Sequence, residues 1–340
     1  MRTTFIKKIT EFAQTDPNVY LVAGDVGFSV IEEFAQKFPT RYFNAGVAEQ
    51  NMIGVAAGLA MAGKTVYVYT IIPFLIKRCF EQIRVDLCYQ ELPVKLIGVG
   101  GGFSYGALGV THHALEDIAL MRSLPGMTVV APGSKFEAQE LAQDIHELKT
   151  PAYVRLSNIE EKVVYPENTK INLGQAIEII PSHSMYIIAT GNSLDTGFIA
   201  CIQLRALGYD IGLVSMPTIK PLDIKFLLSQ KNTLKALFTI EEHNVIGGLG
   251  EAIARVLCEQ FGTKIIFKAF GVQDFYFHIA GSRSYLNDLA GLSPEKITDA
   301  INTLMKANYD KKQEQNNNTV DNHLSHNLCN PGTAPHELGI

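Results

Sequence analysis

The most informative segment of this chain is Asn44-Ala45-Gly46-Val47-Ala48-Glu49-Gln50-Asn51-Met52-Ile53-Gly54. A short apolar run precedes it and a run rich in glycine and alanine follows it, which predicts a strand that turns directly into a helix over Glu49–Met61. Acidic side chains are rarely buried without a partner. The carboxyl group of Glu49 therefore either serves the helix N-terminus, where the macrodipole favours an acid, or holds an atom of a ligand.

Outward from this segment, short apolar runs alternate with longer amphipathic runs along nearly the whole chain. This alternation predicts an α/β fold of two domains, with mostly parallel sheets flanked by helices. The predicted strands are Val19–Ala23, Tyr42–Asn44, Thr65–Thr70, Val94–Val99, Thr128–Ala131, Ala152–Leu156, Met185–Ala189, Ile211–Ser215, Ala236–Ile240 and Lys264–Phe270. The predicted helices are Phe5–Ala13, Ile31–Phe38, Glu49–Met61, Phe74–Tyr89, Ala114–Arg122, Lys135–Leu148, Leu194–Leu207, Gly248–Phe261 and Pro294–Met305.

A polar stretch over residues 157–173 is interpreted as a linker between the two domains. We therefore expect one domain over residues 1–165 and a second over residues 166–308. Residues 309–340 are rich in lysine, glutamine, asparagine and histidine and lack the apolar content of a core, which predicts a disordered tail.

Composition and charge narrow the range of partners. The 340 residues are 47% apolar and 19% charged, an ordinary globular balance with enough material for two cores. With 29 basic and 34 acidic residues, the formal charge of −5 argues against nucleic acid or an anionic membrane as the main partner. The longest apolar run, Val66–Ile76, is too short to span a bilayer.

Two further features predict a cytoplasmic location. Charged residues interrupt the first twelve positions, so no signal peptide is expected. The cysteines are odd in number and show no CxxC or metal-ligand spacing, which favours reduced residues and no metal site in this chain; they are Cys79, Cys88, Cys201, Cys258 and Cys329.

Written A-E-Q-N-M-x-G-x-A-x-G-L-A, residues 48–60 resemble the pyrimidine-binding half of transketolase, an enzyme of carbohydrate metabolism that uses thiamine diphosphate. In that family a carboxyl group in a dry pocket hydrogen-bonds a ring nitrogen of the aminopyrimidine and favours its imino tautomer, which removes the thiazolium proton. The resemblance implies that Glu49 binds the cofactor and is catalytic.

The segment Phe74–Arg84 resembles the family segment whose aromatic side chains stack on the aminopyrimidine. The chemistry needs a flat apolar face beside the carboxyl group, so Phe74 is expected to bind the cofactor. The alternative is that Phe74 and Phe80 are ordinary core residues.

The segment Thr111-His112-His113-Ala114-Leu115-Glu116-Asp117 is a second specific match, to the family pattern T-H-x-x-x-E-D. The resemblance implies that His112 points at the substrate and assists proton transfer, and that His112 and His113 both contact the substrate. Loop histidines without a function are the alternative. A metal site is not expected, because no third ligand stands at suitable spacing.

Three residues near the N-terminus complete the resemblance. Arg2 and Ser29 match family residues that hold the phosphate of the acceptor substrate, and Asp25 matches an aspartate that lines the cofactor site at a subunit interface. The alternatives are a solvated charge for Arg2 and a turn or helix-cap residue for Asp25.

The sequence also departs from the family pattern. Gly100 stands where the family usually has a histidine, Leu108 where it has an acid that recognises a sugar hydroxyl, and Asn158 where it has an arginine. The donor and acceptor sugars therefore stay open, although a phosphorylated ketose is expected.

The second domain carries Glu241-Glu242-His243 followed by Gly247-Gly248-Leu249-Gly250, which resembles the E-x-H-x-x-x-G-G-L-G signature of the family's C-terminal domain. The resemblance implies that Glu242 or His243 lies at a dimer contact, and it implies no catalytic role for either.

The resemblance covers about residues 2 to 305 and includes no domain that binds magnesium and the diphosphate. It implies a split transketolase: a transferase that moves a two-carbon ketol unit from a ketose to an aldose. A separate N-terminal subunit with a G-D-G…N motif would bind most of the Mg²⁺ and the diphosphate, in an α2β2 heterotetramer with a homodimer contact. Gly24-Asp25 and Asn51 approach that motif in spacing, but residue 26 is valine and the match is interpreted as accidental.

Other functions compete with this one. The β subunit of a 2-oxoacid dehydrogenase shares the two-domain plan, and a deoxyxylulose phosphate synthase is a related enzyme that is normally one continuous chain. A non-catalytic partner subunit could retain the fold. A nucleotide-binding module is disfavoured, because no phosphate-binding glycine loop is present.

Overall fold

The structure, a computed structural model, describes residues 1–157, 163–262 and 265–309. One compact unit spans Met1–Ile297, and a second begins at Thr298, of which the helical residues up to Tyr309 are described. The predicted tail beyond Tyr309 lies outside the described residues, as does Asn158.

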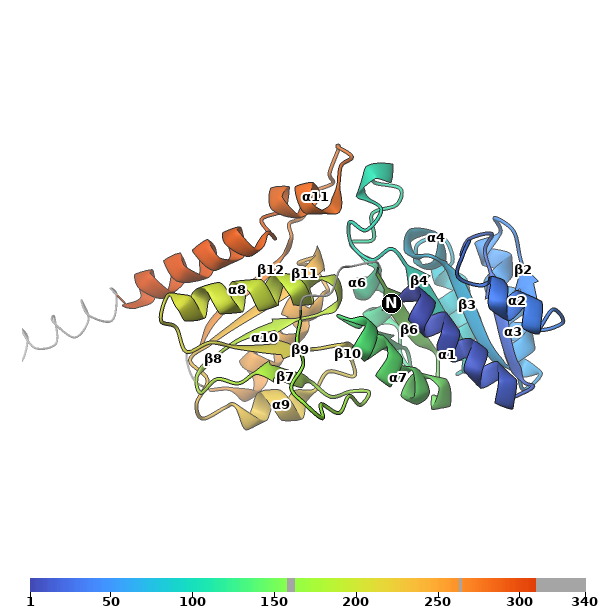
Figure 1. Ribbon diagram of the computed structural model, residues 1–340, viewed down its shortest axis with the longest axis horizontal. Helices are drawn as coiled ribbons and strands as arrows, with labels where there is room; N and C mark the ends of the chain where they lie inside the picture. The colour runs from blue at the N-terminus through green and yellow to red at the C-terminus, as the bar shows by residue number, and fades with distance from the viewer. Residues whose placement is uncertain (158–162, 263–264, 310–340) are drawn as a thin grey trace, which may run out of the picture. The chain divides into compact units, whose positions relative to one another are not determined.

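The first half of the compact unit is built on a seven-stranded sheet in the order β10-β5-β6-β4-β3-β1-β2 (Figure 1). Every neighbouring pair is parallel except the pair of β10 with β5. Strands β4 and β6 are buried at every position, as expected for a parallel sheet between helices, and are mostly apolar apart from Lys95 and Arg155. The strands are β1 (Val19–Ala23), β2 (Tyr42–Asn44), β3 (Thr65–Ile71), β4 (Lys95–Val99), β5 (Thr128–Val130), β6 (Ala152–Leu156) and β10 (Thr218–Lys220).

The helices of this half lie near the predicted positions, but α1 begins three residues early, at Arg2, and the segments over residues 72–89 and 114–123 differ from the prediction. They are α1 (Arg2–Thr15), α2 (Glu32–Lys37), α3 (Glu49–Met61), α4 (Ile72–Ile76), α5 (Phe80–Gln82), the π-helix η1 (Ile83–Tyr89), the short 3₁₀ helix η2 (Gly106–Leu108), α6 (Asp117–Ser123) and α7 (Lys135–Glu147). α3 has the predicted bounds. It begins after Ala48 and places Met52, Ile53 and the inner alanines against the sheet.

The single helix predicted over Phe74–Tyr89 is wrong, because the segment is divided into α4, α5 and η1. The break falls at residues 77–79. In this break Lys77 forms an ion pair with Glu116, and Arg78 forms one with Glu49. Helix α6 begins three residues later than predicted. The backbone of Ala114 is bonded in both directions to Gly102, 3.0 Å for each bond, and so cannot enter the helix.

The second half is built on a five-stranded sheet in the order β12-β11-β8-β9-β7, in which only β7 is antiparallel to its neighbour. Its strands are β7 (Ile177–Ile180), β8 (Met185–Ala189), β9 (Gly212–Ser215), β11 (Ala236–Asn244) and β12 (Ile266–Val272). Its helices are the 3₁₀ turn η3 (Gly191–Ser193), α8 (Leu194–Ala206), α9 (Ile224–Ser229), α10 (Leu249–Gln260) and α11 (Arg283–Leu289). The predicted helix over Pro294–Met305 is present as helical residues 294–309.

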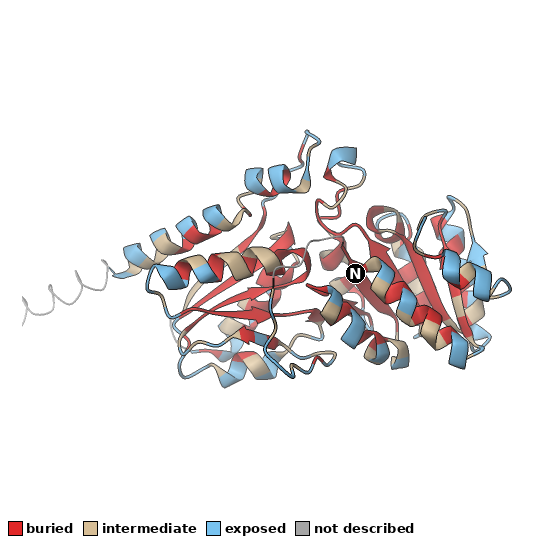
Figure 2. Ribbon diagram, in the orientation of Figure 1, coloured by how far each residue is buried: buried red, intermediate tan, exposed pale blue. Residues whose placement is uncertain are grey.

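The inner strands of both sheets are buried, the edge strand β2 is largely exposed, and the helices expose their outer faces (Figure 2). The predicted class, two α/β domains with mostly parallel sheets flanked by helices, is confirmed. The predicted strands of the first half lack β10, and those of the second half lack β7. Within the described part of the chain, no helix combines the length and the apolar character that a bilayer crossing requires.

Candidate functional site

The predicted site residues gather where parallel strands of the first sheet end. Asp25 follows β1, Glu49 follows β2, Phe74 follows β3, and His112 lies in the loop between β4 and α6. The carboxyl ends of parallel strands meet at one edge of a sheet, which is where open α/β folds bind ligands.

Glu49 is the first residue of α3, and its side chain is only 2% exposed. The residue before the helix, Ala48, provides no side-chain cap, and the carboxylate of Glu49 instead accepts a hydrogen bond of 2.6 Å from Nη1 of Arg78. A buried carboxylate needs such a partner. Its charge therefore faces the site rather than the helix backbone.

Arg78 joins Glu49 to Phe74. Its guanidinium carbon lies 5.1 Å from the centroid of the Phe74 ring, and its backbone carbonyl accepts a hydrogen bond from the side chain of Gln50. The guanidinium is a flat group that donates an N–H to a buried carboxylate and lies against an aromatic face. An aminopyrimidine would make the same two contacts with Glu49 and Phe74, so these residues fit the cofactor of the resemblance.

His112 extends this group of side chains. Its ring meets the ring of Phe74 edge to face, with 5.1 Å between centroids, and Tyr105 stands 6.3 Å away on a second side. The hydroxyl of Thr111 lies 2.9 Å from Nδ1 of His112, which orients the imidazole. Glu49, Arg78, Phe74 and His112 thus form one continuous group.

His113 turns the other way. It is 2% exposed, its ring meets the ring of Phe103 at 5.2 Å, and its Nε2 lies 3.3 Å from the carbonyl oxygen of Gly106. Burial lowers the pKa of His113, so the neutral ring is favoured. The position of His113 gives no support to the prediction that it contacts the substrate.

Two of the three N-terminal residues, Asp25 and Ser29, follow the end of β1. The side chains of Asp25 and Asn44 are bonded at 3.0 Å, and Asn44 also accepts a bond of 3.1 Å from the Asp25 amide. Asp25 and Ser29 both have positive φ values, 54° and 61°, a strained backbone found at functional sites. A shallow cavity of about 220 Å³ lies beside them, lined in part by Asp25, Glu32 and Asn44. Arg2 is the first residue of α1.

Two of the departures from the family pattern have structural correlates. Gly100 has a φ of +89°, and a Cβ there would lie 2.2 Å from the ring of Tyr105, so no histidine could occupy this backbone. Leu108 is 58% exposed at the tip of the same loop.

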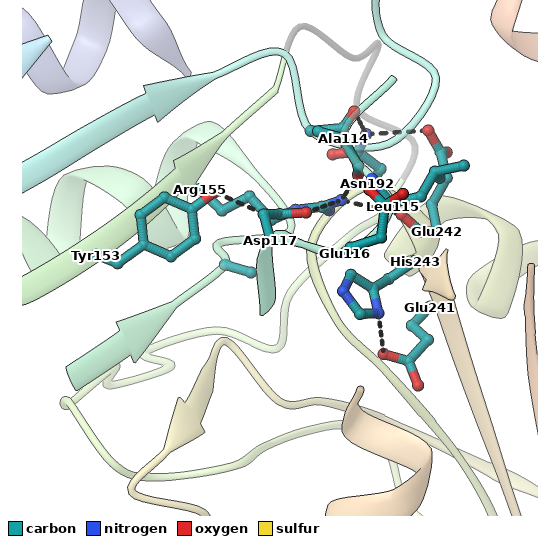
Figure 3. Close-up of polar contacts among 12 residues, drawn as sticks. Ala114, Leu115, Glu116, Asp117, Tyr153, Arg155, Asn192, Glu241, Glu242 and His243 are labelled. Carbon is teal, nitrogen blue, oxygen red and sulfur yellow. Dashed lines mark hydrogen bonds and ion pairs between the residues drawn. The ribbon is translucent and has the colours of Figure 1, made fainter. Parts of the chain in front are cut away.

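The sequence did not reveal a buried polar network that joins the two halves of the unit (Figure 3). Arg155 in β6 donates to Asp117 from Nε at 2.8 Å, and its Nη2 donates to the carbonyl oxygen of Glu242 at 3.0 Å. The side chains of Glu242 and His243 are 2% and 0% exposed. Both side chains are enclosed within the chain, and their position gives no support to the prediction that either lies at a dimer contact.

Arg78 was also missed as a site residue. A local signal existed, since Arg78 lies four positions after Phe74 on the predicted helix, where side chains share a face. Among the described residues, no group of three or more histidine, cysteine, aspartate or glutamate side chains could hold a metal ion.

Comparison with known families identifies both halves. The transketolase pyrimidine-binding domain matches residues 1–161, and the transketolase C-terminal domain matches residues 174–297. Fold and site therefore define a chain of the pyrimidine-binding class, with a second α/β domain attached.

Relatives of similar length refine this class. The chain is 33% identical over 281 residues to one of the subunits of the apulose-4-phosphate transketolase of Actinobacillus succinogenes, covering 83% of this chain and 90% of the relative. It is 34% identical over 309 residues to a putative transketolase C-terminal section of Methanocaldococcus jannaschii, covering 90% and 96%. A solved split-gene transketolase, described as an inactive beta4 tetramer, superposes with a TM-score of 0.80 at 32% identity, covering 90% of this chain and 97% of that chain.

The chain belongs to the transketolase family. Its two domains correspond to the C-terminal section of a split transketolase, which confirms that prediction from the sequence.

Proposed function

We propose that this chain, with a separate subunit, forms a thiamine diphosphate-dependent enzyme that transfers a two-carbon ketol unit from a ketose to an aldose. The observation that carries the proposal is the buried carboxylate of Glu49, which faces a flat N–H donor lying against Phe74. When bound, thiamine diphosphate supplies the carbon nucleophile of this chemistry. Glu49 would bind and protonate a ring nitrogen of the aminopyrimidine, and Phe74 would hold its face.

His112 would act on the substrate. It lies beside Phe74, and the hydroxyl of Thr111 fixes its ring. An imidazole can give or take a proton near neutral pH. We assign His112 the proton transfers at the donor hydroxyls.

The site for the acceptor substrate has fewer contacts to define it than the cofactor site around Glu49 and Phe74. Arg2 at the start of α1 and Ser29 after β1 would bind a phosphate group, and Asp25, also after β1, would line the cofactor site. Leu108 offers no carboxylate to a sugar hydroxyl, so a substrate that lacks one polar group is compatible with this loop. This leaves the identity of the sugars to experiment.

A separate subunit would supply the diphosphate and Mg²⁺ sites in an α2β2 assembly. The solvent face of α3 supports a contact there, because it exposes Asn51, Gly54, Gly58 and Met61. Small residues allow two helices to approach closely, and 62% exposure of Met61 leaves apolar surface available to a partner. The β4 tetramer of the related split-gene protein also supports assembly through chains of this type.

A cytoplasmic location is part of the proposal. It is supported by the absence of disulfides among the described cysteines, Cys79, Cys88, Cys201 and Cys258.

The test is the substitution Glu49→Gln. Its amide keeps the size of the side chain but cannot share a proton with the ring nitrogen. We expect ketol transfer to fall by a factor of roughly 100 or more, the scale of general acid–base catalysis, while assembly with the diphosphate-binding subunit is retained. The assay mixes both subunits with thiamine diphosphate, Mg²⁺ and a panel of ketose donors.

The exposed substitution Glu259→Gln is the matched control and should leave turnover unchanged. Equal turnover of Glu49→Gln and the control would show that Glu49 is not the catalytic acid of the proposed reaction. Decarboxylation of a 2-oxoacid without ketol transfer would instead identify a dehydrogenase-type subunit.

A further inference from the structure

The loop that carries His112 is anchored by the second domain. Residues 100–113 follow the end of β4. Side chains of η3 and β11 bind this loop, and side chains of α11 bind the β11 carboxylate that does so. We propose that Glu242 is a positioning residue, which fixes this loop and thereby places His112 in the candidate active site. The inference rests on the proposed function of His112.

The carboxylate of Glu242 is the centre of the anchor. One oxygen accepts a hydrogen bond of 2.7 Å from the amide of Phe103 in the loop. The other accepts from Nε of Arg283 at 2.8 Å and from Nδ2 of Asn287 at 2.9 Å. Burial alone would raise the pKa of Glu242, but the charge of Arg283 and the hydrogen bonds outweigh it and lower the pKa, which keeps the carboxylate ionised.

The loop is shaped to reach this carboxylate. Gly102 has a φ of +64°, and a Cβ on it would lie 2.1 Å from Oε1 of Glu242. The neighbouring carbonyl oxygen of Gly101 accepts a hydrogen bond of 2.8 Å from Asn192. Only glycine allows the backbone to approach the carboxylate so closely.

Short contacts connect the part of the loop that Glu242 holds to His112. Gly102 and Ala114 are bonded in both directions at 3.0 Å, so the residue fixed beside Glu242 also fixes the position two residues after His112. The ring of Phe103 packs between His113 and Phe277, with centroids 5.2 and 5.1 Å away.

A second attachment lies further along the loop. The amide of Gly281 donates to the carbonyl oxygen of Gly106 at 3.2 Å. These contacts hold the loop at residues 101–106 and again at Ala114, so both ends of the segment that carries His112 are fixed. Placement of a catalytic group within a fraction of an ångström is worth large factors in rate.

If Glu242 had a purely structural role, it would stabilise the contact between the two domains without affecting the position of His112. Glu241 provides the matched comparison, because it is the preceding residue of β11, is equally buried, and binds the amides of Leu249 and Gly250 at 2.7 and 2.8 Å instead of the loop.

The experiment compares Glu242→Leu with Glu241→Leu in the full chain. Hydrogen exchange of the amides in residues 101–113 is measured on the chain alone, below the unfolding temperature of both variants. We expect Glu242→Leu to speed exchange at Phe103 by roughly tenfold or more, the equivalent of losing a hydrogen bond to a charged group. Glu241→Leu should leave that exchange unchanged.

Turnover in the assembled enzyme supplies the second readout. Glu242→Leu should lower kcat by roughly tenfold to hundredfold with a smaller change in KM, because His112 is displaced rather than lost. Glu242→Gln keeps an acceptor for the Phe103 amide and should restore both exchange and kcat. Gly102→Ala, which pushes the loop off an intact carboxylate, should reproduce the effect of Glu242→Leu even if that variant fails to fold.

Equal loop exchange in the Glu242 and Glu241 variants, or wild-type kcat in Gly102→Ala, would overturn the inference. The exchange measurement does not need activity. If wild-type enzyme shows no ketol transfer while the loop loosens as expected, the proposed function fails and the anchor stands as a purely structural one.

Discussion

Replacing Asp117 by asparagine should be among the most destabilising single changes of a polar side chain in this protein. The carboxylate of Asp117 accepts hydrogen bonds from the hydroxyl of Tyr153 at 2.6 Å and from Nε of Arg155 at 2.8 Å (Figure 3). The side chains of Asp117 and Arg155 are each 1% exposed, so no water can replace a lost partner. The substitution leaves a buried guanidinium without its counter-charge.

The magnitude follows from that burial. Removing one partner of a buried ion pair costs about 3–5 kcal/mol, since the remaining charge keeps its desolvation penalty. Asparagine retains one oxygen that can still accept from Arg155 or Tyr153, which places the expected loss near the lower end, at about 3 kcal/mol. With a midpoint shift of about 2–4 °C for each kcal/mol, Tm should fall by roughly 6–12 °C.

The assay is thermal unfolding of the chain alone, followed by circular dichroism and by fluorescence of a bound dye to test for a single transition. Glu259→Gln is the control, because it makes the same acid-to-amide change in the exposed pair with Arg255 at 2.7 Å and should leave Tm unchanged. If Asp117→Asn lowers Tm no more than Glu259→Gln, the buried pair is not a stabilising element and the reasoning fails.

Two further predictions concern other parts of the chain. Gly58→Ala places a methyl group where nothing lies within 4 Å, so it should stabilise α3 and the isolated chain by roughly 1 kcal/mol. The same methyl group should weaken binding of the partner subunit in a binding titration, and unchanged binding would place the interface elsewhere. Burial lowers the pKa of His243 to about 4, so between its ordinary value of 6.5 and that pH the folded chain binds fewer protons than the unfolded chain. The free energy of unfolding should therefore fall by at most roughly 3 kcal/mol as the pH drops from about 6.5 to 4. In urea titrations His243→Gln should make this dependence on pH weaker, and an identical dependence in the variant would contradict the lowered pKa of His243.

Much of the fold could be predicted because its signals are local. Strands β1, β2, β6 and β8 and helix α3 have the bounds that their apolar and small-residue patterns predict. The break after α4 could not be predicted in this way, since Lys77 and Arg78 form ion pairs there with residues distant in sequence. Strand β10 has only three residues between two prolines, which is too short to show the alternation of apolar and polar residues that predicts a strand.

The candidate site was predictable to the same extent. Glu49, Phe74 and His112 stand in motifs, and the structure brings them together. The anchor at Glu242 is different, because its bond to Phe103 joins residues 139 positions apart. A carboxylate that follows a strand looks the same in sequence whether it faces solvent or a loop of another domain.

Strand β10 has a practical consequence. It belongs by sequence to the second domain, but it completes the first sheet by pairing with β5, Thr218 opposite Val130. Cutting the chain at the linker would expose the backbone of β5 as a bare edge, and such edges invite association with other chains. Expression of residues 1–165 alone should thus yield aggregates, and a first domain intended for biophysical work needs a covering segment grafted onto that edge.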